Sequence, residues 1–195
     1  CMEAHAIGVS VDFPENEPAR VAGPMPGSLG RMLEAREPER LHKSDRIKVQ
    51  LEAINIMCNE AGGELFIRGN CDQMAISLAM LAYGMQDIMM DLLDTDAEEG
   101  ILQLMDRSYA VHLEYRKMMR EAGAHAISFG DSSCGPDLIR RECYLKYTYS
   151  WHKRLKEDLD ALGIPVICHI CGNTDNIFCD LASIGFAGME IDCVW

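Results

Sequence analysis

Along the chain, the spacing of apolar residues changes repeatedly between that of a strand and that of a helix. Four short apolar segments, each ended by turn residues, alternate with helical segments; they cover 64–68, 125–129, 165–170 and 187–191. Strands that alternate with helices favour a parallel sheet joined by right-handed crossovers. The C-terminal ends of such strands share one edge, where α/β enzymes place their active sites. We therefore predict an α/β fold with a site at that edge.

The N-terminal third gives weaker signals than the rest of the chain. Alternation over 7–13 predicts a half-buried strand, which Pro14 ends. The proline-rich residues 14–43 predict a long surface loop with a short helix near 29–35. Apolar spacing, capping residues and glycines predict helices over 44–61, 72–83, 85–93, 96–123, 136–163 and 174–184.

Composition narrows the classes of partner. The net charge is -13 and no Lys/Arg run occurs, which argues against nucleic acid or anionic lipid as a partner. No apolar run is long enough to span a bilayer, and the N-terminus lacks a signal-peptide pattern. The nine irregularly spaced cysteines are typical of reduced thiols, so we expect a cytoplasmic protein.

A His-x-Cys pair lies on the segment that begins at Pro165. Side chains on a strand alternate faces, so His169 and Cys171 point the same way. Imidazole and thiolate are zinc ligands, but a zinc site needs a third one. The candidates for that ligand are Asp131, Cys134, Asp192, Cys193 or a residue beyond Trp195. The alternative is a core histidine and a core cysteine, each bonded to a neighbour.

Polar residues also follow the other predicted strands. Asp131 and Ser132 could bind a polar substrate group or act as turn and cap residues, and Asp192 has the same two interpretations. Arg68 could pair with an anionic substrate or with a nearby acid. The other residues of these types receive no chemical role: Cys1, Cys58, Cys143 and Cys179 are predicted to be buried, and His5, His42, His112, His125 and His152 show no partner spacing.

Several stretches resemble one known family. The residues 161–174 (ALGIPVICHICGNT), followed by the strand up to Asp192, are similar to the uroporphyrinogen decarboxylase superfamily. Within it, they look closest to the zinc-dependent corrinoid methyltransferases of the methylcobalamin:coenzyme M type. Residues 7–14, 66–93 and 122–136 match in the same order. The resemblance implies a TIM (β/α)8 barrel in which this chain supplies about strands three to six.

The resemblance also implies a chemistry. The family's methyltransferases bind zinc through a His-x-Cys pair, matched here by His169 and Cys171, and through a second cysteine much further on. Cys193 is too early to be that cysteine. The implied reaction moves a methyl group between a methyl-corrinoid (cobalamin), carried on a corrinoid protein, and a small-molecule thiol or other acceptor or donor. Asn173 would hold the loop or contact the substrate, with Asp131, Ser132 and Asp192 as further substrate contacts.

The sequence leaves two alternative functions open, and it also predicts the domain organisation and the oligomeric state. The first alternative is decarboxylation of a tetrapyrrole without a metal, and the second is a non-catalytic corrinoid or tetrapyrrole binder. Residues 1–195 are predicted to be a single domain, an internal portion of a longer barrel, because a complete barrel takes about 250 residues. The open edges of a partial sheet would favour association, so a homo-oligomer is also expected.

Overall fold

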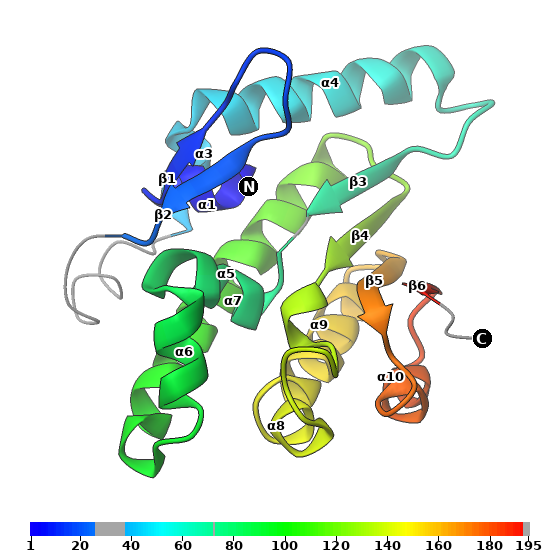
Figure 1. Cartoon of the computed structure of the whole chain (residues 1–195). Helices are drawn as coiled ribbons and strands as arrows, with labels where there is room; N and C mark the ends of the chain where they lie inside the picture. The colour runs from blue at the N-terminus through cyan, green and yellow to red at the C-terminus, as the bar shows by residue number, and fades with distance from the viewer. Residues whose placement is uncertain (26–37, 72, 193–195) are drawn as a thin grey trace.

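The computed structural model describes residues 1–25, 38–71 and 73–192. Its main sheet has four parallel strands whose order in space equals their order in the chain (Figure 1). These strands are β3 (Arg68–Cys71), β4 (Ala126–Gly130), β5 (Val166–Asn173) and β6 (Gly188–Asp192). A separate antiparallel pair joins β1 (Ser10–Asp12) to β2 (Arg20–Gly23). Parallel neighbours in chain order are the arrangement of a (β/α)8 barrel segment, so the predicted α/β class is confirmed.

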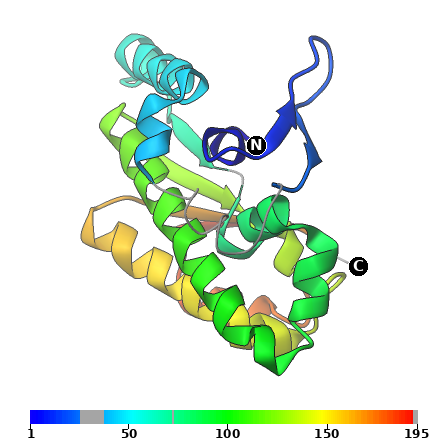
Figure 2. The ribbon, with the colours of Figure 1, turned by 90° about the vertical axis from the view of Figure 1, so that its left-hand side faces the viewer.

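Helices fill every connection of the parallel sheet. The helical elements are α1 (Met2–Ala6), α3 (Glu39–Lys43), α4 (Asp45–Ala61), α5 (Ala75–Tyr83), α6 (Met85–Asp91), η1 (Thr95–Ala97), α7 (Glu98–Glu121), η2 (Ser132–Cys134), α8 (Arg141–Tyr147), α9 (Tyr149–Ala161) and α10 (Phe178–Ile184). The helices α7 and α9 run side by side along one face of the sheet (Figure 2), where Tyr109 donates a hydrogen bond to Asp158 at 2.5 Å. No helix in these described ranges is both long and apolar enough to cross a membrane.

The two faces of the parallel sheet differ in chemistry. Side chains such as Cys71, Phe129 and Cys168 are buried beneath the helices. The alternate side chains, among them Arg68 and His169, lie on the opposite face and are only partly covered. That face would line the interior of a closed barrel, because side chains on a strand alternate between the two sides. The polar face therefore carries the groups available for chemistry.

The predicted strand over 7–13 is wrong in its first half. The chain forms α1 just before it, and the strand covers only Ser10–Asp12. Ile7 and Val9 are buried as predicted, but Gly8 between them has a φ of 104°, which breaks an extended backbone. The alternating burial of residues 7–9 therefore comes from an irregular turn and not from a strand. The helix predicted near 29–35 lies outside the described residues.

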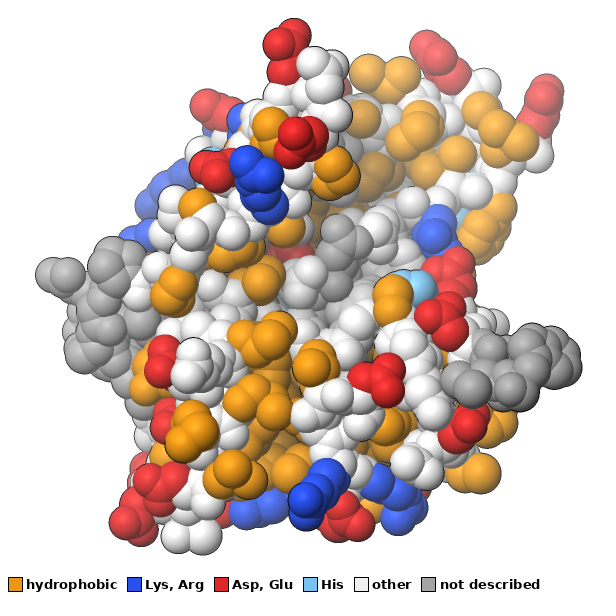
Figure 3. Space-filling model, viewed as in Figure 1, with side chains coloured by type: hydrophobic (Ala, Val, Ile, Leu, Met, Phe, Trp, Pro, Cys, Tyr) orange, Lys and Arg blue, Asp and Glu red, His pale blue; other side chains and the backbone are white. Residues whose placement is uncertain are grey.

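The predicted strand over 64–68 begins four residues too early. Its apolar residues Leu65 and Phe66 are 60% and 67% exposed, and β3 starts at Arg68. Hydrophobic atoms gather at the upper right of Figure 3, over the end of α4 and the loop that leads to β3. The apolar residues that predicted a strand therefore lie in the loop before it. The strand itself is polar on its open face.

Three predicted helices have different ends. The helix over 136–163 is divided into α8 and α9 at Thr148, whose φ of -120° is not helical, and it begins only at Arg141. The helix over 174–184 shortens to α10, which starts at Phe178. Asp94 rather than Asp96 caps the turn before α7, accepting the Asp96 N–H at 2.9 Å. The helix after Ser44 is confirmed, with α4 ending just before Gly62.

Candidate metal centre

The imidazole of His169 and the thiol of Cys171 meet on the open face of β5. Their Nε2 and Sγ atoms are 2.9 Å apart, on the same side of the strand as the period of two predicts. Two ligands of one tetrahedral zinc ion would lie about 3.5 Å apart, given the usual Zn–N and Zn–S bond lengths. A small rotation of either side chain supplies that difference. Both side chains reach solvent, His169 being 40% exposed, so the pair fits a zinc ion at an accessible site.

Glu190 lies beside the second ring nitrogen of His169. The two residues are register partners on β5 and β6, and Glu190 Oε2 is 3.8 Å from His169 Nδ1. This distance is too long for a hydrogen bond but short enough for electrostatic attraction. The other carboxylate oxygen accepts a hydrogen bond from Arg68 Nη1 at 2.5 Å. Arg68 thus pairs with a nearby acid, one of its two predicted interpretations. Metal-bound histidines commonly direct their other nitrogen at such a carboxylate.

The loop that carries Cys171 is held by side chains from other segments. Three successive N–H groups donate to them: Cys171 to Ser132 Oγ (3.1 Å), Gly172 to Asp192 Oδ2 (2.8 Å) and Asn173 to Asp137 Oδ2 (3.2 Å). The side chain of Asn173 accepts the Asp175 N–H at 2.8 Å and so stabilises the turn after β5. Ser132, Asn173 and Asp192, predicted as substrate contacts, therefore all lie at the loop of the metal pair.

Asp131 is placed differently from these residues. Its side chain is fully buried, and its two oxygens accept hydrogen bonds from Ser77 and from His152 Nε2, the latter at 2.8 Å. His152 is also fully buried, with Nδ1 3.3 Å from the hydroxyl of Tyr144. The carboxylate of Asp131 thus points into the core. Only its backbone reaches the metal loop, where its N–H donates to the His169 carbonyl at 3.0 Å.

His169 and Cys171 are two candidate ligands at the end of β5. Groups of three potential ligands with donor atoms within 4.8 Å of one another occur at two other, buried places: Glu3–Cys71–His112 and Asp131–Cys134–His152. Neither group includes His169 or Cys171. Asp131 and Cys134, two predicted candidates for the third ligand, therefore belong to a separate buried cluster. Cys193 lies outside the described residues.

Sequence reasoning missed Glu190, His112 and His152. Glu190 carried a signal, since an acid inside a predicted strand must face either the core or the open side. His152 carried none, because its partner Asp131 is 21 residues away on another element. His112 likewise meets Cys71 Sγ at 3.3 Å only through the packing of α7 against β3.

The thiols of Cys134 and Cys168 are buried, whereas the thiol of Cys171 is exposed. Burial raises the pKa of Cys134 well above its usual value, and the negative charge of Asp131 raises it further. Burial and Asp131 raise the pKa of Cys168 in the same way. Cys171 is exposed, and so is Cys179, which was wrongly predicted to be buried. Since the thiolate is the reactive form, the buried thiols should be inert.

Brief treatment of the native protein with iodoacetamide is expected to label Cys171 and Cys179 but not Cys134 or Cys168. Peptide mass spectrometry identifies the labelled positions. Zinc added beforehand should protect Cys171 and leave Cys179 reactive, because only the former has an adjacent imidazole ligand. Equal labelling of the buried thiols, or equal protection of Cys179, would contradict this assignment.

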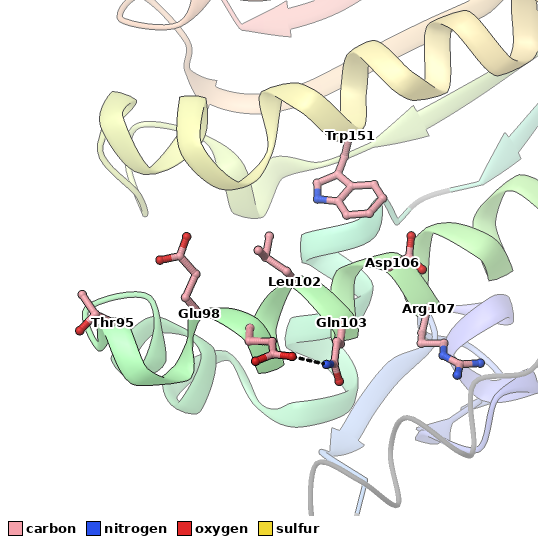
Figure 4. A pocket seen from close by; sticks show the side chains of 8 residues that line it. Thr95, Glu98, Leu102, Gln103, Asp106, Arg107 and Trp151 are labelled. Carbon is pink, nitrogen blue, oxygen red and sulfur yellow. Dashed lines mark hydrogen bonds between the residues drawn. The ribbon is translucent and has the colours of Figure 1, made fainter.

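A groove of about 890 Å³ lies on the outer helical surface, away from the metal pair. It runs between α7 and α9, with Trp151 on one wall (Figure 4). The opposite wall comes from η1 and α7 and consists of Thr95, Glu98, Glu99, Leu102, Gln103, Asp106 and Arg107. None of these residues reaches the polar face of the sheet described above. The groove is therefore separate from the candidate metal centre.

Comparison with known proteins agrees with this geometry. Residues 1–195 match the profile of the uroporphyrinogen decarboxylase (URO-D) family. The methylcobamide:CoM methyltransferase MtaA of Methanosarcina barkeri is 28% identical over 191 residues, 97% of this chain and 53% of that protein. The methylcobamide:CoM methyltransferase MtbA of Methanosarcina acetivorans is 33% identical over 147 residues, 75% of this chain and 42% of that protein.

The fold comparison gives the same result. A solved methyltransferase from Methanosarcina mazei superposes with a TM-score of 0.85 and 25% identity, covering 96% of this chain and 54% of that one. The chain thus spans about half the length of the relatives it matches. The expected barrel type is confirmed, with the parallel strands of this chain forming part of it. The chain belongs to the uroporphyrinogen decarboxylase (URO-D) family.

Proposed function

We propose that this protein acts in zinc-dependent methyl transfer between a methyl-corrinoid and a small thiol or other acceptor or donor. The observation that carries the proposal is the 2.9 Å approach of His169 Nε2 to Cys171 Sγ on the open face of β5. The relatives named as methylcobamide:CoM methyltransferases support the substrate class. The donor set supports zinc, because nitrogen and sulfur ligands are the ones zinc prefers in proteins.

In this proposal each residue of the centre has a defined task. His169 and Cys171 hold the metal, and Glu190 orients the imidazole through Nδ1. A bound zinc ion would lower the pKa of a substrate thiol and keep it as the nucleophilic thiolate. Asn173 and Asp192 lie at the rim of the same loop, where they can contact that substrate. A third protein ligand would complete the set, and the candidates that remain are Asp192, Cys193 and a residue beyond Trp195.

The proposed partner is a protein that carries the corrinoid. A corrinoid is a large ring, and its cobalt must come close to a thiolate held at the open face, so the carrier has to dock on that side. We also propose a cytoplasmic location, consistent with the free thiols of Cys134, Cys168, Cys171 and Cys179. The outer edges of β3 and β6 can pair with further strands or with a second copy, which keeps a homo-oligomer among the proposals.

The test is a transfer assay with the intact protein, methylcobalamin and coenzyme M. We expect the methyl thioether to accumulate while the methylcobalamin spectrum changes to that of the demethylated form. Removal of zinc by a chelator should abolish the transfer, and added zinc should restore it. Mass spectrometry of the thiol product measures the reaction directly.

Two outcomes of that assay would replace the proposal. Metal-independent decarboxylation of a porphyrinogen, without methyl transfer, would indicate the activity in the family's name. Saturable corrinoid binding without transfer to any thiol or other acceptor would indicate a non-catalytic binder. The His-x-Cys contact favours methyl transfer over both, because neither alternative needs a metal.

A further inference from the structure

Three successive peptide groups at the end of β5 are each held by a side-chain hydrogen bond from outside the strand's regular ladder. The β4–β5 ladder ends where the carbonyl of His169 accepts the Asp131 N–H, and the N–H groups of Cys171, Gly172 and Asn173 then donate to Ser132, Asp192 and Asp137. We propose that these three side chains are positioning residues of the metal centre. We call Ser132, Asp137 and Asp192 the loop anchors. The inference rests on the proposed metal site and gives Ser132 and Asp192 a positioning task in addition to substrate contact.

The regular ladder is interrupted where the anchors act. Ile170 pairs with Ile191 and Asn173 with Asp192, so β5 advances three residues while β6 advances one. Cys171 and Gly172 therefore form a bulge, and side-chain oxygens replace the strand partners of their N–H groups. The two extra residues change the local direction of the backbone, and one of them is Cys171, the proposed sulfur ligand.

Gly172 shows how closely the anchors approach the backbone. Its φ is 86°, a conformation that side chains rarely tolerate. A Cβ atom at this position would lie 2.5 Å from Asp137 Oδ2. Both the backbone twist and the approach of the anchor therefore require glycine. The anchored bulge is a specific conformation that another residue here would disrupt.

The anchors hold the backbone that carries the sulfur of Cys171. The peptide group before Cys171 is held by Ser132, and the peptide group after it is held by Asp192. Fixing the planes on both sides of a Cα atom fixes its φ and ψ, and with them the direction of its Cα–Cβ bond. The anchors come from three separate segments: η2, the turn before α8 and the end of β6. The position of the loop that carries Cys171 therefore depends on how these three segments pack.

The zinc affinity of alanine and asparagine variants shows whether Asp137 and Asp192 act as hydrogen-bond acceptors or only through their negative charge. Replacing Asp137 or Asp192 by alanine removes both the acceptor and the charge, whereas Asp137→Asn and Asp192→Asn keep an acceptor oxygen. Each alanine variant should bind zinc about 10-fold to 100-fold more weakly in chelator competition, the usual effect of losing an outer-shell partner. The asparagine variants should stay close to wild type. Ser132→Ala should weaken binding, Ser132→Thr should retain it, and Ser133→Ala serves as the matched control.

A second measurement needs no metal. Amide hydrogen exchange at Cys171, Gly172 and Asn173 in the metal-free protein should accelerate in the alanine variants and remain slow in the asparagine variants. If the wild-type protein fails to bind zinc, the proposed metal site is rejected. If amide exchange is nevertheless faster in the alanine variants, the side chains of the loop anchors still hold the loop. Asparagine variants that lose as much zinc affinity as the alanine variants would show a charge effect and overturn the anchors. So would alanine variants that change only the KM for the thiol.

Discussion

Replacing His169 and Cys171 together by alanine is expected to abolish zinc binding. The proposal assigns both imidazole and thiolate ligands of the described residues to this pair, and the two other ligand clusters of the described chain are separate from it and buried. Zinc affinity should fall by more than about 100-fold, the largest loss usual for an outer-shell partner alone. Metal analysis after dialysis against a chelator measures the retained zinc. Wild-type protein should keep near-stoichiometric metal under the same conditions.

A matched control replaces one exposed histidine and one exposed cysteine elsewhere on the chain. His42 bonds Glu114 at the surface, and Cys179 is exposed on α10. The His42→Ala, Cys179→Ala double variant should keep its zinc, because neither residue lies at the metal centre. Undiminished zinc in the His169→Ala, Cys171→Ala variant would disprove the site. The proposed methyl transfer would then lose the observation that carries it.

Asp131→Ala is expected to cause a large loss of stability. Asp131 and His152 form a fully buried pair at 2.8 Å, and Ser77 donates to the same carboxylate. Removing the acid leaves a buried imidazole and hydroxyl without their acceptor. Breaking a buried pair in this way costs roughly 3–5 kcal/mol. For a protein of this size, thermal unfolding of the metal-free protein should shift down by roughly 10 °C.

An exposed ion pair provides the comparison. Asp106 pairs with Arg154 at 3.1 Å, and both side chains are at least half exposed. Asp106→Ala should therefore cost about 1 kcal/mol or less. Asp131→Asn, which keeps one acceptor oxygen, should fall between the two alanine variants. An Asp131→Ala shift no larger than that of Asp106→Ala would mean that the buried pair contributes little to stability.

The metal pair was the part of the site easiest to predict from sequence. His169 and Cys171 are two residues apart on an apolar run, and the period of a strand predicts that their side chains share one face. Asp131 and Ser132 were correctly expected at a strand end, but adjacent residues there have opposite environments. The first enters the core and the second reaches the metal loop. Spacing along one segment cannot separate these outcomes.

Spacing along the chain was also insufficient to predict some strand boundaries and helix ends. Leu65 and Phe66 have the composition of a strand but lie in the loop before β3, because β3 pairs through Arg68–Cys71. The break at Thr148 between α8 and α9 leaves no mark in the helical spacing. Backbone pairing and packing override local propensity at such places.

By itself, the sequence determined the alternation of strands and helices, the parallel sheet and the shared face of His169 and Cys171, because these depend on periodicity within single segments. Only the tertiary structure decided the partners: Glu190 beside His169, the loop anchors beneath Cys171, and His152 against Asp131. Each of these contacts joins different elements across the register of the sheet or the packing of a helix. Such distances depend on how whole elements are placed, which no local pattern encodes.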